Sequence, residues 1–237
     1  SRLRQYARTK IFPMLHLHHC VSARSFRPLW MLEELQLPYQ LHMLPFPPRA
    51  KARWFLDENP LGTVPLLVQG DVRMTESAAI CQYLAATHPD AGLDVAPTHP
   101  AYGAYLNWLH MSDATLTFPQ TLVLRYGRFE PAERKQPQVV EDYSRWFLAR
   151  LRAVETAMTH GRSDYLCAGR FTAADVAVGY ALLLAQHLGL NEQFGPATQA
   201  YWQRLQQRPG YQRAMAAQKE AAQYQDVPTT PAPDTKP

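Results

Sequence analysis

The stretch Asn59–Ser77 reads NPLGTVPLLVQGDVRMTES, and its succession of turn, strand and helix signals decides the fold. Two short apolar runs, 64–68 and 72–74, flank a tight turn at 69–71, which predicts a β-hairpin. Apolar residues at helical spacing then predict a helix over about 75–87. The stretch therefore predicts a ββα unit.

The residues upstream predict a βαβ unit. Strands are expected over 14–21 and 38–44, with a helix over 26–37 between them. Such a unit takes a right-handed crossover. Joined to the ββα unit, it predicts a thioredoxin-like domain of the βαβββα type over residues 14–90. The connection at 45–60 is long, basic and rich in proline, and connections of this length are often functional.

The second half of the chain predicts an all-helical domain. After a linker at 91–98 no further strand is expected, so residues 99–225 are predicted to form a helical bundle. Thr172 and Asp175 have the spacing of a capping box at a helix start. Residues 226–237, rich in Pro and Thr, are predicted to be a disordered tail. The expected helices cover 102–126, 139–159, 173–189, 198–207 and 211–224. The fold class is thus α/β plus all-α.

The charge of the chain does not favour nucleic acid as a partner. The 237 residues carry a formal net charge of +4, and Arg2, Arg4, Arg8 and Lys10 supply four positive charges with no acid before residue 13. The remaining residues therefore sum to zero, whereas nucleic-acid binding needs a clustered basic face. Residues 1–13 are interpreted as an extension, either native or added, ahead of Met14.

Composition also bears on the compartment. No run approaches the ~18 apolar residues of a membrane span, and the first residues lack a secretory signal core, so we expect a cytoplasmic protein with no membrane partner. Cys20, Cys81 and Cys167 cannot all pair with one another, and no CxxC spacing occurs. A disulfide framework and a zinc knuckle are both disfavoured.

The edge at Pro65 and the following helix start indicate a binding site. A proline there removes a ladder donor, and a cis bond would leave the backbone of Val64 free to pair with an extended peptide. At Glu76 and Ser77, the free amides of a helix start would hold a carboxylate, and Glu76 would pair with an ammonium. The alternative is that Pro65 is only an edge proline and Ser77 only a cap.

From residue 14 to about 224 the chain resembles the cytosolic glutathione S-transferase superfamily. The resemblance rests on the order and spacing of several segments, which are a Ser-containing loop, RPLWMLEEL at 27–35, NPLGTVP at 59–65, ESAAI at 76–80 and the Thr172/Asp175 capping box. It implies a thioredoxin-like domain followed by a helical domain, a homodimer, and glutathione as co-substrate without a metal.

The resemblance also implies how glutathione is held. Val64, between Thr63 and Pro65, would bind the cysteinyl backbone. Glu76 and Ser77 would hold the γ-glutamyl unit. The residues implied near the glycyl end are Lys51, Arg53 or Asn59.

Chemistry requires a thiolate, and the pKa of a thiol is ~8.5. Lowering it by ~2 units takes ~2.7 kcal/mol, which a hydroxyl hydrogen bond and a helix N-terminus can supply. We predict Ser22 as the catalytic hydroxyl, as in the zeta-like spacing, and then Ser25 or its backbone N–H. The theta-like register would place the serine at Ala23, and the beta-like cysteine position holds Arg24.

The second substrate is expected to be a small hydrophobic electrophile, as in detoxification. Trp108 and Met111 recur at helical spacing and are predicted to line its pocket, while Arg125 would meet an anionic substrate if it is not simply solvated.

Two other functions stay open. One is a glutathione- or ligand-binding or protein-interaction protein without catalysis. The other is a thiol reductase that uses Cys20. His16, His18 and Cys20 share a strand face, but no fourth ligand is evident, so a metal site is not predicted.

Overall fold

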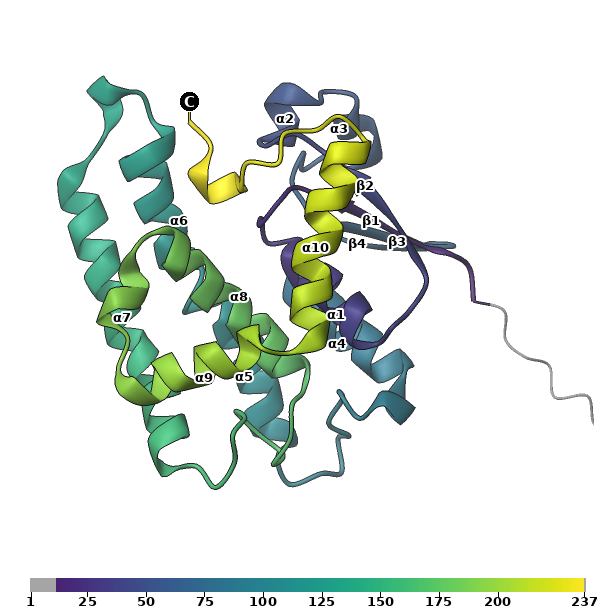
Figure 1. Cartoon of the computed structure of the whole chain (residues 1–237), viewed down its shortest axis with the longest axis vertical. Helices are drawn as coiled ribbons and strands as arrows, with labels where there is room; N and C mark the ends of the chain where they lie inside the picture. The colour runs from purple at the N-terminus through teal and green to yellow at the C-terminus, as the bar shows by residue number, and fades with distance from the viewer. Residues whose placement is uncertain (1–11, 237) are drawn as a thin grey trace, which may run out of the picture.

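The structure, a computed structural model that describes residues 12–236, shows an α/β part beside a helical part (Figure 1). The sheet of the α/β part has the order β2-β1-β3-β4. β1 pairs in parallel with β2 and antiparallel with β3, which pairs antiparallel with β4. The strands are β1 (Leu15–His19), β2 (Tyr39–Met43), β3 (Leu66–Gln69) and β4 (Val72–Met74). The predicted βαβ and ββα units are confirmed, and residues 1–11 of the predicted extension lie outside the described range.

The two faces of β1 have different surroundings, as its alternating sequence predicts. Leu15 and Leu17 are buried in the main core. His16 and His18 are half-buried on the other face, where the rings of His18 and His42 stack with their centroids 4.8 Å apart. The helices of this part are α1 (Phe26–Glu34), α2 (Pro48–Lys51), α3 (Phe55–Glu58) and α4 (Ser77–Thr87). Within residues 12–236 no group of three His, Cys, Asp or Glu side chains has a metal-binding arrangement.

The helical part differs from prediction at its start. Instead of one helix over 102–126, the chain forms α5 (Tyr102–Ala114) and α6 (Phe118–Leu124), followed by a π-helical turn η2 (Arg125–Phe129). Pro119 explains the break, because a proline inside a helix lacks an N–H and clashes with the carbonyl four residues earlier. The remaining helices are α7 (Pro137–His160), α8 (Ala173–His187), α9 (Pro196–Gln206) and α10 (Pro209–Tyr224), with 3₁₀ turns at η1 (Pro89–Ala91), η3 (Ala132–Arg134), η4 (Leu190–Gln193) and η5 (Ala232–Asp234).

α8 forms the centre of the helical part, and residues 173–185 are all buried. Its predicted capping box is present: Thr172 Oγ1 accepts from the Ala174 N–H, and Asp175 Oδ2 accepts from the Thr172 N–H at 2.9 Å. α8 approaches α1 closely at Gly179, where an added Cβ would lie 2.6 Å from the Trp30 ring. Glycine is therefore required there for the two parts to pack against each other.

The α/β and helical parts are also joined through the fully buried Arg27 of α1. Its Nε donates to the Ala177 carbonyl of α8, and its Nη1 donates to Ser77 Oγ of α4 and to Asp113 Oδ1 of α5. Its Nη2 donates to the Ser112 carbonyl and to Thr117 Oγ1. All three guanidinium nitrogens are therefore hydrogen-bonded without water.

α10 lies against the α/β part rather than in the helical bundle (Figure 1), where it packs on α1 and β2. Gln225 Nε2 donates to the Leu41 carbonyl, and Gln225 Oε1 accepts from the Met43 N–H. The end of α10 thus covers the otherwise open edge of β2.

The prediction that the C-terminal tail is disordered is corrected by the structure. After α10, residues 226–236 turn back across the molecule (Figure 1), and the Ala232 N–H donates to the Val21 carbonyl at 2.7 Å. Ala232 and Pro233 are buried. Composition predicted disorder because these residues form no core of their own, but they dock on a surface that the rest of the chain supplies.

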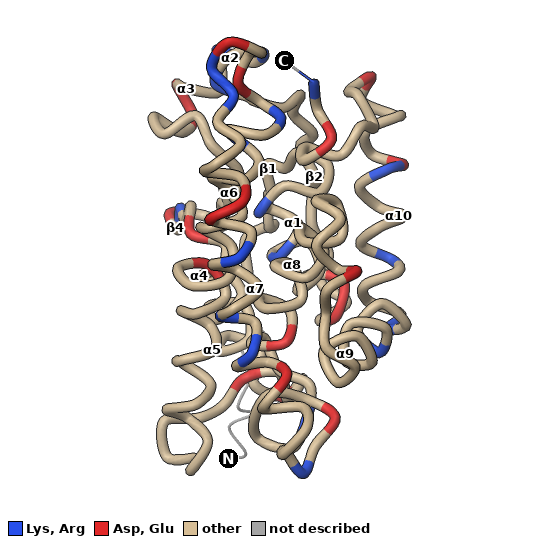
Figure 2. The backbone as a smooth tube through the Cα atoms, turned by 90° about the vertical axis from the view of Figure 1, so that its left-hand side faces the viewer, with Lys and Arg blue, Asp and Glu red and all other residues tan. Residues whose placement is uncertain are grey.

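Charged residues of both signs are distributed over the helices, and the residues around α2 include a group of basic ones (Figure 2). These are Arg49, Lys51 and Arg53. They belong to the connection at 45–60, for which a functional role was expected because of its length.

At the end of β1, His19 is fully buried in a hydrogen-bonded chain. Gln218 Oε1 of α10 lies 2.9 Å from His19 Nε2 and can only accept, so Nε2 carries the proton. The Ser25 hydroxyl then donates to His19 Nδ1 across 2.6 Å. Burial lowers the pKa of His19 from 6.5 to about 4, although the Gln218 hydrogen bond partly opposes the shift.

The lowered pKa of His19 predicts that this residue makes the fold less stable in acid. In the unfolded chain it gains a proton near pH 6.5 but in the folded protein only near pH 4, so the unfolded state binds more protons between these values. The contribution of His19 to the free energy of unfolding should be constant above pH 7 and should fall by about 3 kcal/mol as pH drops from 6.5 to 4. Urea denaturation over this range measures it.

A His19→Leu variant should be less stable than the parent at pH 8, because Ser25 and Gln218 lose a partner, but its stability should depend less on pH. His110→Gln, on the exposed face of α5, controls for loss of a histidine. An equal pH dependence in His19→Leu and the parent would show that His19 is not its source.

Candidate functional site

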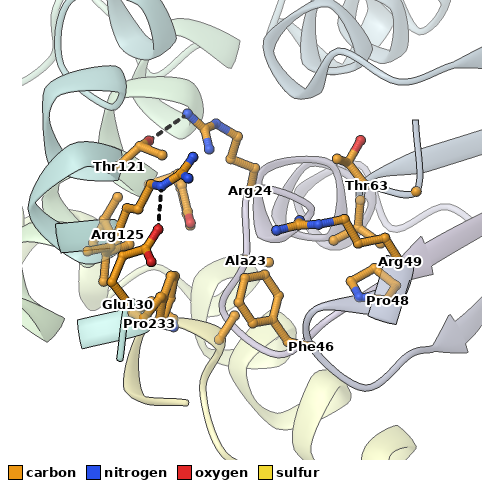
Figure 3. A pocket seen from close by; sticks show the side chains of 17 residues that line it. Ala23, Arg24, Phe46, Pro48, Arg49, Thr63, Thr121, Arg125, Glu130 and Pro233 are labelled. Carbon is orange, nitrogen blue, oxygen red and sulfur yellow. Dashed lines mark hydrogen bonds and ion pairs between the residues drawn. The ribbon is translucent and has the colours of Figure 1, made fainter. Parts of the chain in front are cut away.

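A cavity of about 480 Å³ lies between the α/β part and the helical part (Figure 3). Arg49 and Arg125 lie on opposite sides of it (Figure 3). The lining residues are Ala23, Arg24, Pro48, Arg49, Gly62, Thr63 and Val64 of the α/β part, Thr121, Leu124, Arg125, Phe129, Glu130, Tyr180 and Leu184 of the helical part, and Phe46, Ala232 and Pro233 on a third side. The cavity thus combines apolar surface with several cations.

The α/β wall is shaped by the loop before β3. Asn59 Nδ2 donates to the Thr63 carbonyl at 2.8 Å, and Asn59 Oδ1 accepts from the Leu61 N–H. Gly62 has φ +62°, and an added Cβ would lie 2.8 Å from Arg49 Cβ. The Val64–Pro65 peptide bond is cis, as anticipated for this edge. Among residues 12–236 neither the N–H nor the C=O of Val64 has a hydrogen-bond partner.

The N-terminal end of α1 reaches the cavity through Ala23 and Arg24. Arg24 Nε donates to Asp113 Oδ1 at 2.8 Å, and its Nη2 donates to Thr121 Oγ1 at 3.1 Å. Asp113 Oδ1 also accepts from Arg27. Burial alone would raise the pKa of Asp113, but the Arg27 and Arg24 guanidiniums outweigh it and hold this pKa below its usual value. One carboxylate is therefore shared by two arginines, which leaves a net charge of +1.

The two serines predicted as thiol activators are not among the lining residues. The Ser25 hydroxyl lies against His19 and accepts from the Cys20 N–H. The Ser22 hydroxyl accepts from Gln218 Nε2 at 3.2 Å, and the Ser22 N–H donates to Gln218 Oε1. Both side chains are buried, at 2% exposure or less. In this structure they hold the β1–α1 loop against α10 rather than face the cavity.

The residues predicted for glutathione divide into two groups. Thr63 and Val64 line the cavity, whereas Pro65 is buried and is not among the lining residues. Glu76 is exposed at the N-cap of α4, and Ser77 Oγ is occupied by Arg27.

The predicted glycyl-end residues lie apart from the cavity. Asn59 is buried and supports the Thr63 loop, while Lys51 and Arg53 are exposed. Lys51 instead lines a separate hollow of about 370 Å³ beside the C-terminal segment. Of the basic group around α2, Arg49 is the one that faces the cavity.

The residues predicted for the electrophile do not line this cavity either. Trp108 packs on the main core, and Met111 Sδ accepts from Asn107 within α5. The break at Pro119 turns the chain so that α6 and η2 form the helical wall instead. Leu124 and Arg125 lie near the end of the helix predicted over 102–126, and Phe129 lies just beyond it, but their place at the cavity depends on that break.

The third side of the cavity is formed by the C-terminal segment and Phe46. Pro233 lines the cavity, and its carbonyl accepts from Arg128 Nη1 at 3.0 Å. Asp234 pairs with Arg128 and with His187 Nδ1, each at 2.9 Å. No pattern in the sequence indicated that residues more than 100 positions apart would meet here.

Comparison with known proteins now identifies the family. A family model described as glutathione S-transferase, N-terminal domain, matches residues 21–87. Glutathione S-transferase GstA of Escherichia coli O157:H7 is 31% identical over 165 residues, which cover 68% of this chain and 76% of that protein. The chain belongs to the glutathione S-transferase family. Glutathione S-transferase 3 of Schizosaccharomyces pombe is 32% identical over 103 residues, 44% of this chain but only 43% of that protein.

Solved structures of glutathione S-transferases show the same fold. The glutathione transferase from Methylococcus capsulatus strain Bath superposes with a TM-score of 0.76 at 26% identity, covering 86% of this chain and 98% of that one. A sphingomonad glutathione S-transferase complexed with glutathione has a TM-score of 0.74 at 23% identity, with 86% and 98% covered. The resemblance inferred from sequence, including the thioredoxin-like and helical parts, is confirmed. None of the described helices is long and apolar enough to span a membrane.

The C-terminal wall of this family member is predicted to depend on Asp234. An Asp234→Asn substitution removes the charge that pairs with Arg128 and His187, so the segment should detach more often. Partly exposed ion pairs contribute about 1 kcal/mol, which predicts about fivefold faster hydrogen exchange at the Ala232 amide. Exchange followed by mass spectrometry measures it.

Asp226→Asn, the same change at an exposed position of the same segment, is the matched control and should leave the exchange unchanged. Equal exchange rates in both variants would mean that the contacts of Asp234 with Arg128 and His187 do not hold this wall.

Proposed function

We propose that the protein is a glutathione transferase that binds glutathione along the Thr63–Val64 edge and delivers its thiolate to a small electrophile in the same cavity. The observation that carries this is a juxtaposition: the unpaired backbone groups of Val64 and the N-terminal end of α1 line one cavity. A peptide that pairs with Val64 therefore brings its sulfur to the positive end of a helix. The sphingomonad relative, which shares the fold, holds glutathione.

The groups around this edge suit the rest of glutathione. The α-amino and α-carboxylate groups of its γ-glutamyl unit would bind at the start of α4, with the ammonium at the exposed Glu76 and the carboxylate at the backbone of Ser77. The glycyl carboxylate would meet Arg49, which lines the cavity beside Thr63. Lys51 and Arg53, predicted for this role, would act at longer range through their positive charge, and Asn59 would act by holding the loop.

Thiol activation is assigned to Arg24 and the backbone N–H groups of the loop just before α1, because the Phe26 and Arg27 amides already donate to the Ala23 and Arg24 carbonyls. The Ser22 and Ser25 hydroxyls are both hydrogen-bonded within the protein. Arg24, by contrast, is about one third exposed, lines the cavity and lies at the start of α1. A helix N-terminus and a nearby guanidinium together can supply the ~2.7 kcal/mol that lowers a thiol pKa by ~2 units. The Ser25 backbone N–H belongs to the same group of donors.

The two alternative functions are supported to different degrees. The occupied serine hydroxyls favour a protein that binds glutathione without activating it, so this remains the second candidate. The Cys20 thiol reductase has less support, because Cys20 is fully buried and burial raises the pKa of its thiol. A homodimer and a cytoplasmic location belong to the same proposal, as in the family at large.

The thiol pKa of bound glutathione tests the proposal. Ultraviolet absorbance of the thiolate, followed against pH, should show a pKa lowered by ~2 units from ~8.5 in the parent protein. Arg24→Gln should raise this pKa by about one unit, because the guanidinium is lost while the positive end of the α1 dipole and the loop N–H groups before it remain. Ser22→Ala should leave the pKa of the bound thiol unchanged and cost only the ~1 kcal/mol of the Gln218 hydrogen bond in stability.

Three other outcomes would change the conclusion. Bound glutathione with an ordinary thiol pKa in the parent protein would support the non-catalytic candidate. Loss of the shift in Ser22→Ala would return the role to the serine. No heat with glutathione in calorimetry would end the proposal.

A further inference from the structure

The part of the cavity that glutathione would leave open has an apolar wall. This inference rests on the proposed function, in which the tripeptide occupies the side formed by Thr63 and Arg49. The opposite side is formed by Leu124, Phe129 and Leu184 of the helical part, with Pro233 of the C-terminal segment. Such a wall favours a flat, apolar or aromatic group.

A cation faces the same space. The Arg125 side chain is 57% exposed, and its Nε donates to Glu130 Oε1 at 2.9 Å. Its two terminal nitrogens have no hydrogen-bond partner among residues 12–236. Glu130 is the only acid among the residues that line the cavity. Its other oxygen, Oε2, is taken by Arg134 at 2.8 Å, so this group of three also carries a net charge of +1.

The two carboxylates in this region are therefore already paired with arginines of the protein. Asp113 is shared by Arg24 and Arg27, and Glu130 is shared by Arg125 and Arg134. Each carboxylate holds two arginines, and one positive charge of each group remains for a ligand. An anionic electrophile would supply acceptors for the two terminal nitrogens of Arg125, which Glu130 leaves unused, whereas an uncharged electrophile would not.

We infer that the preferred second substrate is an anionic aromatic electrophile, whose ring packs on Leu124 and Phe129 and whose carboxylate or sulfonate accepts hydrogen bonds from the free nitrogens of Arg125. In a chloronitrobenzoate, the glutathione sulfur forms a bond to the ring carbon that carries chlorine. The carbon–chlorine bond then breaks, chloride leaves with the bonding electrons, and the thiol proton is released to solvent.

A matched pair of compounds tests this. 4-Chloro-3,5-dinitrobenzoate carries the anion, and its methyl ester presents the same reacting carbon without the charge. After correction for the uncatalysed rates, kcat/KM should favour the acid over the ester. Arg125→Gln should lower this acid-to-ester ratio about tenfold, which is the effect of losing one hydrogen bond to a charged group.

Arg134→Gln is the control, because it removes the same charge from the same carboxylate but not from the cavity lining. It should keep most of the acid-to-ester ratio. The Kd of glutathione, measured by calorimetry, should be unchanged in Arg125→Gln, since Arg49 is assigned to the glycyl carboxylate.

The outcomes separate this inference from the proposed function. Three results would overturn the inference and leave glutathione binding in place, provided that glutathione binds normally. They are no preference for the acid, turnover of neither compound, and the same acid-to-ester ratio in Arg125→Gln as in the parent protein. Weaker glutathione binding in Arg125→Gln shows that the cation serves glutathione, which also overturns it. No glutathione binding by the parent protein overturns both.

Discussion

The buried guanidinium of Arg27 is the interaction on which the arrangement of the two parts depends. It comes from α1, and its hydrogen bonds reach α4, α5 and α8 and the Ser112–Thr117 turn. A charge removed from water in this way is very costly unless every donor is satisfied. The sheet domain and the helical domain therefore cannot shift against each other without breaking several charge-assisted hydrogen bonds at once, and the contact of Trp30 with Gly179 adds a steric limit in the same place.

The cavity is a consequence of this junction. Asp113, which neutralises Arg27, also accepts from Arg24, so the position of the charge at the start of α1 is set by the same carboxylate that joins the domains. Because Ser77 Oγ accepts a hydrogen bond from Arg27 Nη1, the start of α4 is tied to Arg27 as well. Two helix N-termini that could each hold part of an anionic peptide are thus fixed relative to one another by one side chain, which suits a site that must orient its ligand within a fraction of an ångström.

Local sequence patterns predicted the strands, most of the helices and the edge at Val64, because periodicity, turn residues and caps act over a few residues. They could not predict what each hydroxyl would bond to. Ser22 had the spacing of a thiol activator and Ser25 was the second candidate of the same loop, yet Gln218, 196 residues after Ser22, bonds directly to Ser22 and, through His19, holds Ser25. Trp108 and Met111 fitted a helical face, but the break at Pro119 placed α6 and η2 at the cavity. These choices follow from tertiary contacts, which local pattern does not encode.

The three walls of the cavity are held with different strength, and that difference bears on access. The α/β and helical walls are fixed through buried contacts of α1. The wall formed by residues 232–234 depends on one backbone hydrogen bond to Val21 and on the partly exposed contacts that Arg128 and His187 make with Pro233 and Asp234. Pro231 and Pro233 limit what the segment loses in conformational entropy when it docks, so few contacts suffice to order it. Because the contacts are few, little free energy is needed to release the C-terminal segment. We therefore expect a substrate to enter past this segment more readily than between the α/β and helical parts.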